Sequence, residues 1–246
     1  MTTEKARVEL YNDNIGFVEL DDYMGNDVKI VNAARVSFGQ KKEVLDKKDE
    51  RLIRYLIKHK HTSTLEHNVV TFRIKVPLYV ARQHMRHRTW SYNEISRRYT
   101  SVDLQFYEQE EFRTQHKSNR QASDADNLVN PMITYSNFEE TDASSAIALH
   151  HKNSFELFST LIESGVCREQ ARGVLPQNMY TEYIATTNLN NLIKFLNLRT
   201  HAGAQKEIVD LALGMKEICK TIWPSIFRIY EELQNEDNIK ASKQAN

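Results

Sequence analysis

The clearest structural signal in the chain is a strict alternation of apolar and polar residues between positions 70 and 76. The apolar residues are Val70, Phe72, Ile74 and Val76. Successive side chains of a strand point to opposite faces of its sheet, so this pattern predicts a strand with one buried face. Pro77 ends the strand and suits the first turn of a helix, which we place at about residues 78–87.

The other elements expected from periodicity mix helices and strands without a regular βαβ order. A second strand is predicted at residues 179–187. Apolar residues at helical spacing predict helices at residues 49–61, 146–163, 189–198 and 204–223, with an amphipathic piece around residues 226–233. We therefore predict an α/β fold of the α+β kind in a single domain.

A long polar segment interrupts this order. Residues 108–145 are rich in Asn, Asp, Ser, Gln and Glu and show little periodicity, so we interpret them as a surface insertion. We assign residues 1–235 to one domain that carries this insertion, and residues 236–246 to a solvated tail.

Charge and apolar runs argue against several classes of protein. Lys+Arg and Asp+Glu both total 33, so the formal net charge is zero, which argues against a protein that coats nucleic acid. No apolar run approaches the ~20 residues of a membrane span, and no signal peptide is visible. The cysteines, Cys167 and Cys219, form no CxxC pair. We therefore expect a cytoplasmic protein without disulfides, with both thiols buried.

Glycine is scarce, with seven residues in the whole chain. None of them belongs to a GxGxxG loop or a P-loop. A bound nucleotide would therefore have its phosphates held by side chains and not by a glycine-rich backbone.

The densest group of polar side chains spans residues 86–99. It contains four arginines, a histidine, two serines, an asparagine and a carboxylate, with few apolar residues. Arginine forks bind phosphate or carboxylate at two points, and serine hydroxyls add neutral donors. A solvated, charged helix end is the alternative. Glu94 argues against that alternative, because an acid inside an arginine cluster needs a reason to be there.

A window of histidines and one glutamate is the second group with possible chemistry. Its members are His59, His61, Glu66, His67 and His84. These residue types ligate zinc or iron, but the spacing matches neither HExxH nor a zinc finger, and we predict no metal. Two rival classes stay open on residues alone: a metal-dependent phosphohydrolase that uses this window, and a nucleic-acid-binding module that uses the arginine cluster.

Arg86-His87-Arg88, followed after seven residues by Ser96, resembles the RHRx7S signature of flavin-dependent thymidylate synthases of the ThyX type. Further blocks resemble this family in the same order. The first block is Ala33-Ala34-Arg35-Val36-Ser37-Phe38, and the second is Lys58-His59-Lys60-His61 with Glu66-His67. The third block consists of Ser164-Gly165-Val166, Arg168, Ala171-Arg172 and Leu175-Pro176. The fourth block consists of Asn188, Phe195-Leu196-Asn197-Leu198-Arg199, Ala204-Gln205 and Glu207. The resemblance implies the fold of thymidylate synthase-complementing proteins, with an antiparallel-type sheet flanked by helices.

The resemblance also implies two sets of binding residues. FAD would be held by Ser37, Ser63, Arg86, His87, Arg88, Glu94, Asn188, Leu189, Asn190 and Lys194. The substrate dUMP would be held by Gln83, Arg86, Glu94, Ser96, Arg97, Arg98, Arg172 and Arg199. Part of the second set would come from a neighbouring subunit of a homotetramer.

The implied reaction is the reductive methylation of dUMP to dTMP, a step of dTTP biosynthesis. The carbon would come from 5,10-methylenetetrahydrofolate and the hydride from FAD reduced by NADPH. Arg199 would face the uracil ring and stabilise negative charge as N3 loses its proton. His61 would lie near the folate and flavin rings. These two residues are the implied catalytic pair.

The chain departs from the family at three places. Ser63-Thr64-Leu65 stands where Thr-Pro-Phe is frequent, Asn190 replaces a common arginine, and Gly203 replaces a common histidine. Glycine offers no side-chain contact. We therefore expect His201, by stacking or hydrogen bonding, or Lys194, as a cation, to supply part of the missing flavin contact.

Overall fold

An antiparallel five-stranded sheet lies at the centre of the computed structural model, with the spatial order β1-β2-β3-β9-β4. The structure describes residues 6–100, 103–120, 122–135, 140–201 and 203–244. The five strands are β1 (Arg7–Leu10), β2 (Gly16–Met24), β3 (Val69–Pro77), β4 (Ser91–Glu94) and β9 (Tyr180–Asn188). β3 and β9 pair along their full length, from Val69 opposite Asn188 to Pro77 opposite Tyr180.

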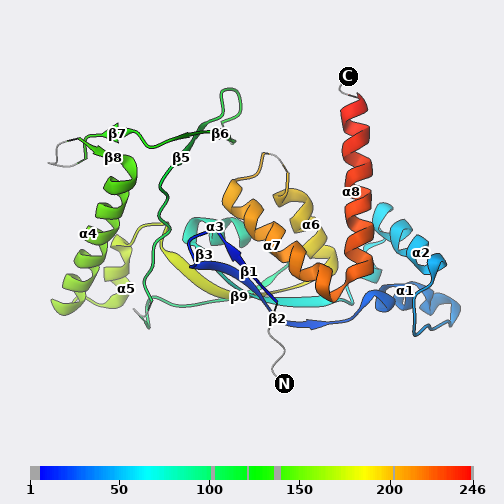
Figure 1. Ribbon diagram of the computed structural model, residues 1–246. Coiled ribbons are helices and arrows are strands. Elements are labelled where there is room, and N and C mark those ends of the chain that lie inside the picture. The colour runs from blue at the N-terminus through cyan, green and yellow to red at the C-terminus, as the bar shows by residue number, and fades with distance from the viewer. Residues whose placement is uncertain (1–5, 101–102, 121, 136–139, 202, 245–246) are drawn as a thin grey trace.

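The apolar side of β3 is the floor of the hydrophobic core. The four apolar side chains on this side of the strand, Val70, Phe72, Ile74 and Val76, are all 0% exposed, as the alternation predicts. Three helices cover this face of the sheet: α3 (Leu78–His84), α6 (Leu189–Arg199) and α7 (Lys206–Ile222) (Figure 1). The predicted fold class, a single domain with an antiparallel sheet flanked by helices, is confirmed.

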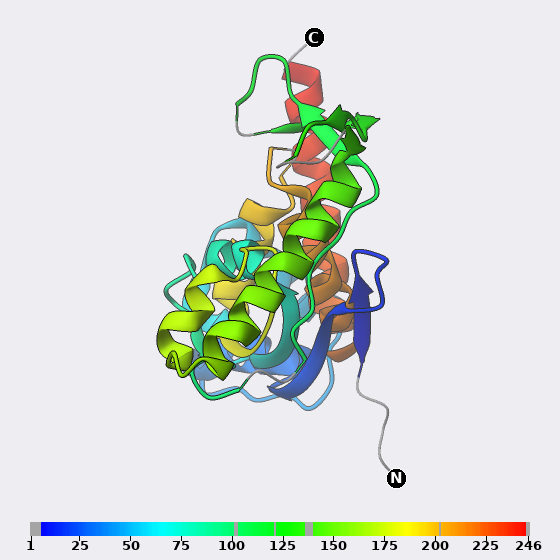
Figure 2. The same cartoon turned by 90° about the vertical axis from the view of Figure 1, so that its left-hand side faces the viewer.

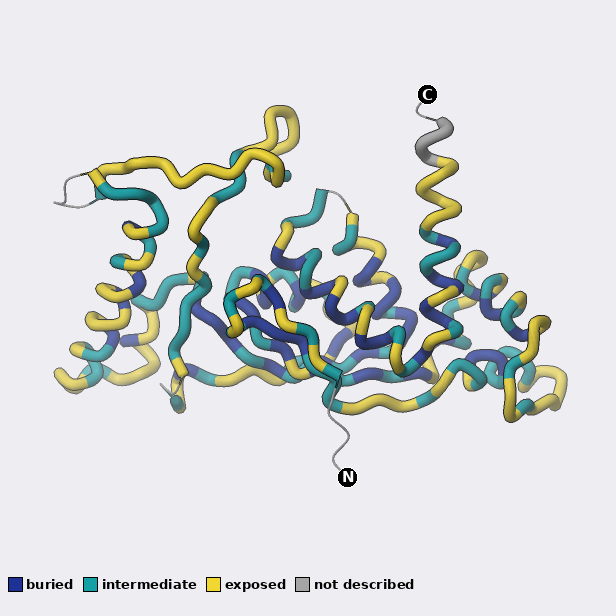
Figure 3. Tube along the Cα trace, viewed as in Figure 1, coloured by how far each residue is buried: buried dark blue, intermediate teal, exposed yellow. Residues whose placement is uncertain are grey.

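Buried residues concentrate in the sheet and on the inner sides of α6 and α7 (Figure 3). The close approach of α7 to the sheet depends on Gly214. A Cβ atom at this position would lie 2.7 Å from a methyl group of Val18 on β2, closer than such atoms pack. Close packing of α7 against β2 therefore explains why a glycine stands inside this helix.

A second group of helices lies at the far end of the sheet (Figure 1). It consists of α1 (Asp27–Arg35), the short helices η1 (Val36–Phe38) and η2 (Thr62–Leu65), α2 (Lys47–Lys58) and α8 (Pro224–Gln244). The helix predicted at residues 49–61 ends earlier, because Lys60 has a left-handed φ of 57°. α8 continues beyond residue 235, and residues 236–240 lie exposed on it. The domain boundary at residue 235 stays a prediction.

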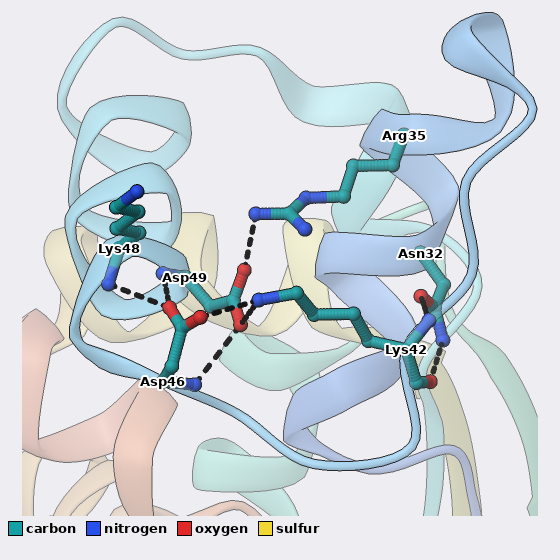
Figure 4. A network of polar contacts seen from close by, with 6 residues as sticks. All are labelled: Asn32, Arg35, Lys42, Asp46, Lys48 and Asp49. Atoms are coloured by element: carbon teal, nitrogen blue, oxygen red, sulfur yellow. Dashed lines mark hydrogen bonds and ion pairs between the residues drawn. The ribbon is translucent and has the colours of Figure 1, made fainter.

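A cluster of polar and charged residues ties the loop after η1 to α1 and α2 (Figure 4). Asp49 is 0% exposed and accepts hydrogen bonds from Arg35 and, at 2.8 Å, from the ammonium group of Lys42. Asn32 exchanges two hydrogen bonds of 2.8 Å with the backbone of Lys42. Asp46 and Asp49 also form the capping box that begins α2. The cluster therefore fixes both ends of the segment that contains Ser37.

The predicted insertion contains regular structure, although its sequence lacks periodicity. Two small sheets pair β5 (Phe112–Gln115) with β6 (Ser123–Val129), and β7 (Met132–Ile133) with β8 (Thr141–Asp142). They stand apart from the central sheet, beside α4 (Ala143–Glu163), which Gly165 follows with a left-handed φ of 89° (Figure 2). Most side chains of β6 and β7 are exposed, which explains why no apolar pattern marks these strands.

The two cysteines differ in exposure. Cys219 is buried on α7, as expected, but Cys167 is exposed. Our expectation for Cys167 was wrong, because it precedes the short helix α5 (Arg168–Ala171) and does not lie on an inward helix face. Among the described residues, none of the helices combines the length and the apolar character that crossing a bilayer requires.

Candidate active site

A buried histidine anchors α3 and the turn that carries the arginine cluster. His84, the last residue of α3, is 0% exposed, and its Nδ1 lies 2.8 Å from the Tyr183 hydroxyl on β9. Aromatic rings pack around it, namely those of Trp90, Tyr92 and Phe195. Burial lowers the pKa of His84 well below its usual range, so the ring is neutral. This anchor leaves Arg86 and Arg88 exposed in the turn.

His87 and Arg199, which we assigned separately to flavin and to substrate, are in direct contact. Arg199 ends α6 and donates from Nε to Nε2 of His87 at 3.1 Å, and from Nη2 to the carbonyl oxygen of Gln83 at 3.3 Å. A guanidinium only donates, so Nε2 of His87 is the acceptor and its proton sits on Nδ1. Burial, with the nearby charge of Arg199 as the second cause, lowers the pKa of His87 to about 4.

Arg199 keeps an uncompensated charge. Some arginines of the chain pair with carboxylates, such as Arg98 with Glu169 at 2.9 Å. Within the described part of the chain, no carboxylate lies within ion-pair distance of Arg199. Burial lowers its pKa from the usual value, yet a guanidinium remains charged at neutral pH. A half-buried cation with two neutral acceptors is suited to bind or stabilise an anion.

The neutral state of His87 predicts a pH dependence. A histidine in the unfolded chain titrates near ~6.5, whereas His87 in the folded chain titrates at about 4. Between these values the unfolded state binds the extra proton. This residue therefore lowers stability progressively as the pH falls through that window, and its contribution is constant above it. In a pH titration followed by the imidazole ¹⁵N shifts, we expect His87 to stay in the Nδ1–H form at pH 6. A His87→Gln variant assigns the signals, and a midpoint near 6.5 would contradict the prediction.

Three residues assigned to dUMP line one cavity of about 510 Å³, which we call the β4 cavity. They are Glu94 at the end of β4, Arg97 in the turn that follows, and Arg172 on η3 (Arg172–Val174). Arg97 is 9% exposed and donates to the carbonyl oxygen of Tyr180 at 3.4 Å. Glu94 accepts from the Thr181 hydroxyl at 2.6 Å. The cavity therefore combines arginine donors with an oriented carboxylate.

Arg82 of α3 lines the same cavity, and our sequence assignment missed it. Its signal was present in the spacing, because Leu78 lies four residues earlier on the same helix face and also lines the cavity. Glu169 belongs to the lining as well and pairs with Arg98. Ser96 lies half-buried in the turn, where its hydroxyl accepts from the backbone N–H of Arg98 at 3.3 Å.

Two residues assigned to FAD line a second cavity of about 510 Å³, between η2, α6 and α8, which we call the α6 cavity. Asn190 is 5% exposed and donates to a carboxylate oxygen of Glu66 at 3.1 Å, while Lys194 is exposed at the rim. The rest of the lining combines apolar side chains and two more lysines with polar residues and one carboxylate, and includes Ile57, Leu65, Ile193, Leu198, Lys58, Lys60, Asn197, Gln234 and Asp237.

The other assigned residues lie at separate places. Ser37 on η1, Ser63 on η2 and His61 before η2 are exposed, and the ring of His61 packs edge-on against Tyr55. Asn188 caps α6 by accepting from the N–H of Asn191 at 3.0 Å. Leu189 is 0% exposed. The structure thus groups some assigned residues in the β4 cavity and others in the α6 cavity, and it pairs His87 with Arg199. Ser37, Ser63 and His61 line neither cavity.

His201 and Lys194, expected to compensate for Gly203, line different cavities. Lys194 belongs to the α6 cavity, whereas His201 lines a third one of about 690 Å³ between α6, α7 and α8. The Nδ1 of His201 accepts from the N–H of Gly203 at 3.1 Å. A Cβ at Gly203 would meet this nitrogen at 3.6 Å, an ordinary contact. Which of the two side chains contacts flavin stays a prediction.

The residues of the histidine window do not gather at one site. His59 and His61 are exposed and both pack against the ring of Tyr55, His67 is exposed after η2, and His84 is buried among aromatic rings. In the part of the chain that the structure describes, no group of three or more His, Cys, Asp or Glu side chains is placed to hold a metal ion.

Comparison with known proteins identifies the family. Residues 19–225 match the family model described as thymidylate synthase complementing protein. The chain belongs to this family. It is 42% identical over 217 residues to the flavin-dependent thymidylate synthase of Thermus thermophilus, covering 88% of this chain and 76% of that protein. It is 38% identical over 218 residues to the one of Thermotoga neapolitana, covering 87% and 90%.

A comparison with solved structures supports the same family. The UMP/dUMP methylase of Streptomyces cacaoi, in a crystal structure bound with 5-Br dUMP, superposes with a TM-score of 0.71 at 32% identity, covering 92% of this chain and 97% of that one. The resemblance seen in the RHRx7S motif is therefore confirmed. The chain is an enzyme of the flavin-dependent thymidylate synthases.

Proposed function

We propose that the enzyme converts dUMP to dTMP with 5,10-methylenetetrahydrofolate as carbon donor and NADPH as reductant of its FAD. The observation that carries the mechanism is the uncompensated Arg199, held by His87 and the Gln83 carbonyl. Methylation at C5 of uracil needs electron density on the ring, and loss of the N3 proton supplies it. A fixed guanidinium at the ring stabilises the resulting negative charge, and it need not reorganise to do so.

The β4 cavity supports the binding of the dUMP phosphate. Arg82, Arg97 and Arg172 line it, and arginine forks bind phosphate oxygens at two points. Glu94, oriented by the Thr181 hydroxyl, adds an acceptor for a sugar hydroxyl. Arg86, Ser96 and Arg98, which lie in or beside the same turn, complete the proposed dUMP set with Gln83.

The α6 cavity fits part of a flavin dinucleotide. Its apolar side chains suit a planar ring, and Lys58, Lys60 and Lys194, which outnumber the one lining carboxylate of Asp237, suit phosphates. FAD bound there supplies the hydride of the reaction. Asn190 and Lys194 would hold it directly, together with Asn188 at the start of α6. Leu189, the first residue of α6, is fully buried and does not line this cavity.

The remaining FAD residues lie on exposed turns. They are Ser37, Ser63, Arg86 and Arg88, with His87 facing Arg199. Exposed site residues on separate turns suit a site completed by a neighbouring subunit, and we propose a cytoplasmic homotetramer. His61, close to the Lys58 and Lys60 of the α6 cavity in sequence, is proposed to lie beside the folate.

The test is dTMP formation by the full chain. We expect flavin-loaded protein to convert dUMP to dTMP under anaerobic conditions with methylenetetrahydrofolate and NADPH, measured by chromatography of the nucleotide. The matched control is the same preparation without FAD, which should form none. A folded, flavin-loaded protein that binds both substrates and makes no dTMP would refute the proposal.

A further inference from the structure

A chain of side-chain hydrogen bonds connects the insertion to the residues that hold Arg199. Arg113 of β5 donates from Nη2 to Oε1 of Glu207 at 2.6 Å. The other oxygen of Glu207 accepts from Nε2 of Gln205 at 2.8 Å. The Oε1 of Gln205 in turn accepts from Nε2 of Gln83. The connected residues come from β5, from the start of α7 and from α3.

Glu207 is the centre of this chain of contacts. It lies in the first turn of α7 and is 2% exposed, and its partner Arg113 is 20% exposed. A buried carboxylate is costly unless its oxygens are paired, and here each oxygen has one donor. Arg113 therefore compensates a charge that the core could not otherwise hold.

The charge on Glu207 also fixes which way the two amides point. An ionised carboxylate only accepts hydrogen bonds, so Gln205 must present its NH₂ group to Glu207. The side-chain carbonyl oxygen of Gln205 then faces Gln83, so Gln83 must donate to it from its own NH₂ group. The remaining carbonyl oxygen and second N–H of Gln83 are thereby held in one orientation. A neutral residue at position 207 would allow both amides to turn over.

The last member of the chain also supports Arg199. The backbone carbonyl of Gln83 accepts from Nη2 of Arg199 at 3.3 Å. Gln205 begins α7 and Arg199 ends α6, so the contact between Gln205 and Gln83 holds the start of α7 against α3, beside the end of α6. Movement of Gln83 would displace both its own amide and the guanidinium of Arg199.

We propose that Arg113 is a positioning residue for substrate binding, acting through Glu207 and Gln205 on Gln83 and Arg199. The insertion thereby has a function, because it supplies the arginine that compensates the charge of Glu207, and that charge sets the amide orientation. This inference rests on the proposed function, in which Gln83 and Arg199 contact dUMP. It concerns substrate binding and leaves the hydride chemistry unchanged.

The first experiment compares Arg113→Ala with Arg113→Lys in the full flavin-loaded enzyme. Loss of a hydrogen bond to a charged group typically weakens an interaction about ten- to a hundredfold. We expect Arg113→Ala to raise both KM and the directly measured Kd for dUMP by about tenfold or more. KM for methylenetetrahydrofolate at saturating dUMP should change by less than about threefold, within the context-dependence of such interactions. Arg113→Lys keeps a cation next to Glu207 and should restore most of the dUMP affinity.

A double variant separates positioning from stability, because Arg113→Ala alone leaves a buried charge unpaired and can unfold the protein. In Arg113→Met with Glu207→Gln both charges are absent and the volumes are similar. We expect its melting temperature to return close to that of the parent enzyme. Its dUMP affinity should stay low, because a glutamine at position 207 no longer fixes the amides. Recovery of both stability and dUMP affinity would overturn the positioning role.

Two control variants are matched to Arg113→Ala. Ser123→Ala removes the other hydrogen bond of Arg113, from Nε at 3.0 Å, and leaves the pair with Glu207 intact. Arg54→Ala removes an arginine that bridges Glu232 and Glu236, on α8. Neither should change the Kd for dUMP. If Arg113→Ala folds and binds dUMP as these controls do, the inference is wrong. If the parent enzyme itself binds no dUMP, the proposed function fails instead.

Discussion

Replacing Arg199 with alanine is expected to lower kcat for dTMP formation by about 10²-fold or more, as removal of one charge-stabilising donor typically does. The expectation follows from its contacts, because His87 Nε2 and the Gln83 carbonyl orient the guanidinium and leave its charge uncancelled. Only the step in which the pyrimidine becomes anionic should slow, so KM for methylenetetrahydrofolate should change little. Single-turnover rates with preformed reduced enzyme measure this step.

The Arg199→Lys variant tests whether the charge alone is enough for activity. An ammonium keeps the charge but cannot reproduce a planar fork that reaches both acceptors, so we expect partial recovery. The alternative role is a cation at the C-terminal end of α6, which is worth about 0.3–1 kcal/mol of stability and nothing in turnover. Near-normal turnover in a folded Arg199→Ala variant would assign the residue to that role.

The parts of the fold that could be predicted are those with a buried face. β3 alternates because one side lies on the core, and α6 and α7 carry apolar residues at helical spacing. β4 could not be predicted, because it pairs along one side only and none of its four residues is buried. The early end of α3 at His84 also has no local signal. It depends on contacts of the His84 ring with β9 and α6, far away in sequence.

Glu94, Arg97 and Arg172, which we assigned to one ligand, line one cavity, and their binding of dUMP stays a prediction. The contact between Arg113 and Glu207 spans 94 positions, and each residue alone looks like an ordinary surface charge. Such long-range pairs are determined by packing and not by local pattern. The fold therefore shows a contact that the sequence does not reveal, between β5 of the insertion and the first turn of α7.

Asp49→Ala is expected to lower the free energy of unfolding by about 3 kcal/mol, because it leaves two cations without their buried partner. Asp49 is 0% exposed and accepts from Arg35, from Lys42 at 2.8 Å and from the backbone N–H of Asp46 at 2.9 Å. Asp49→Asn keeps the shape and one acceptor oxygen, so its loss should be smaller. Urea denaturation followed by circular dichroism measures both.

The same substitution should weaken FAD binding, because the cluster holds the segment with Ser37 between α1 and α2 (Figure 4). The matched control is Glu232→Gln, which also removes a carboxylate with two arginine partners, Arg54 and Arg228. Glu232 is 40% exposed, so its loss should cost under ~1 kcal/mol and leave FAD affinity unchanged. Equal losses of stability in the two variants would show that burial does not set the strength of the Asp49 cluster. A destabilised Asp49→Ala protein with unchanged FAD affinity would show that the order of the Ser37 segment does not serve the flavin.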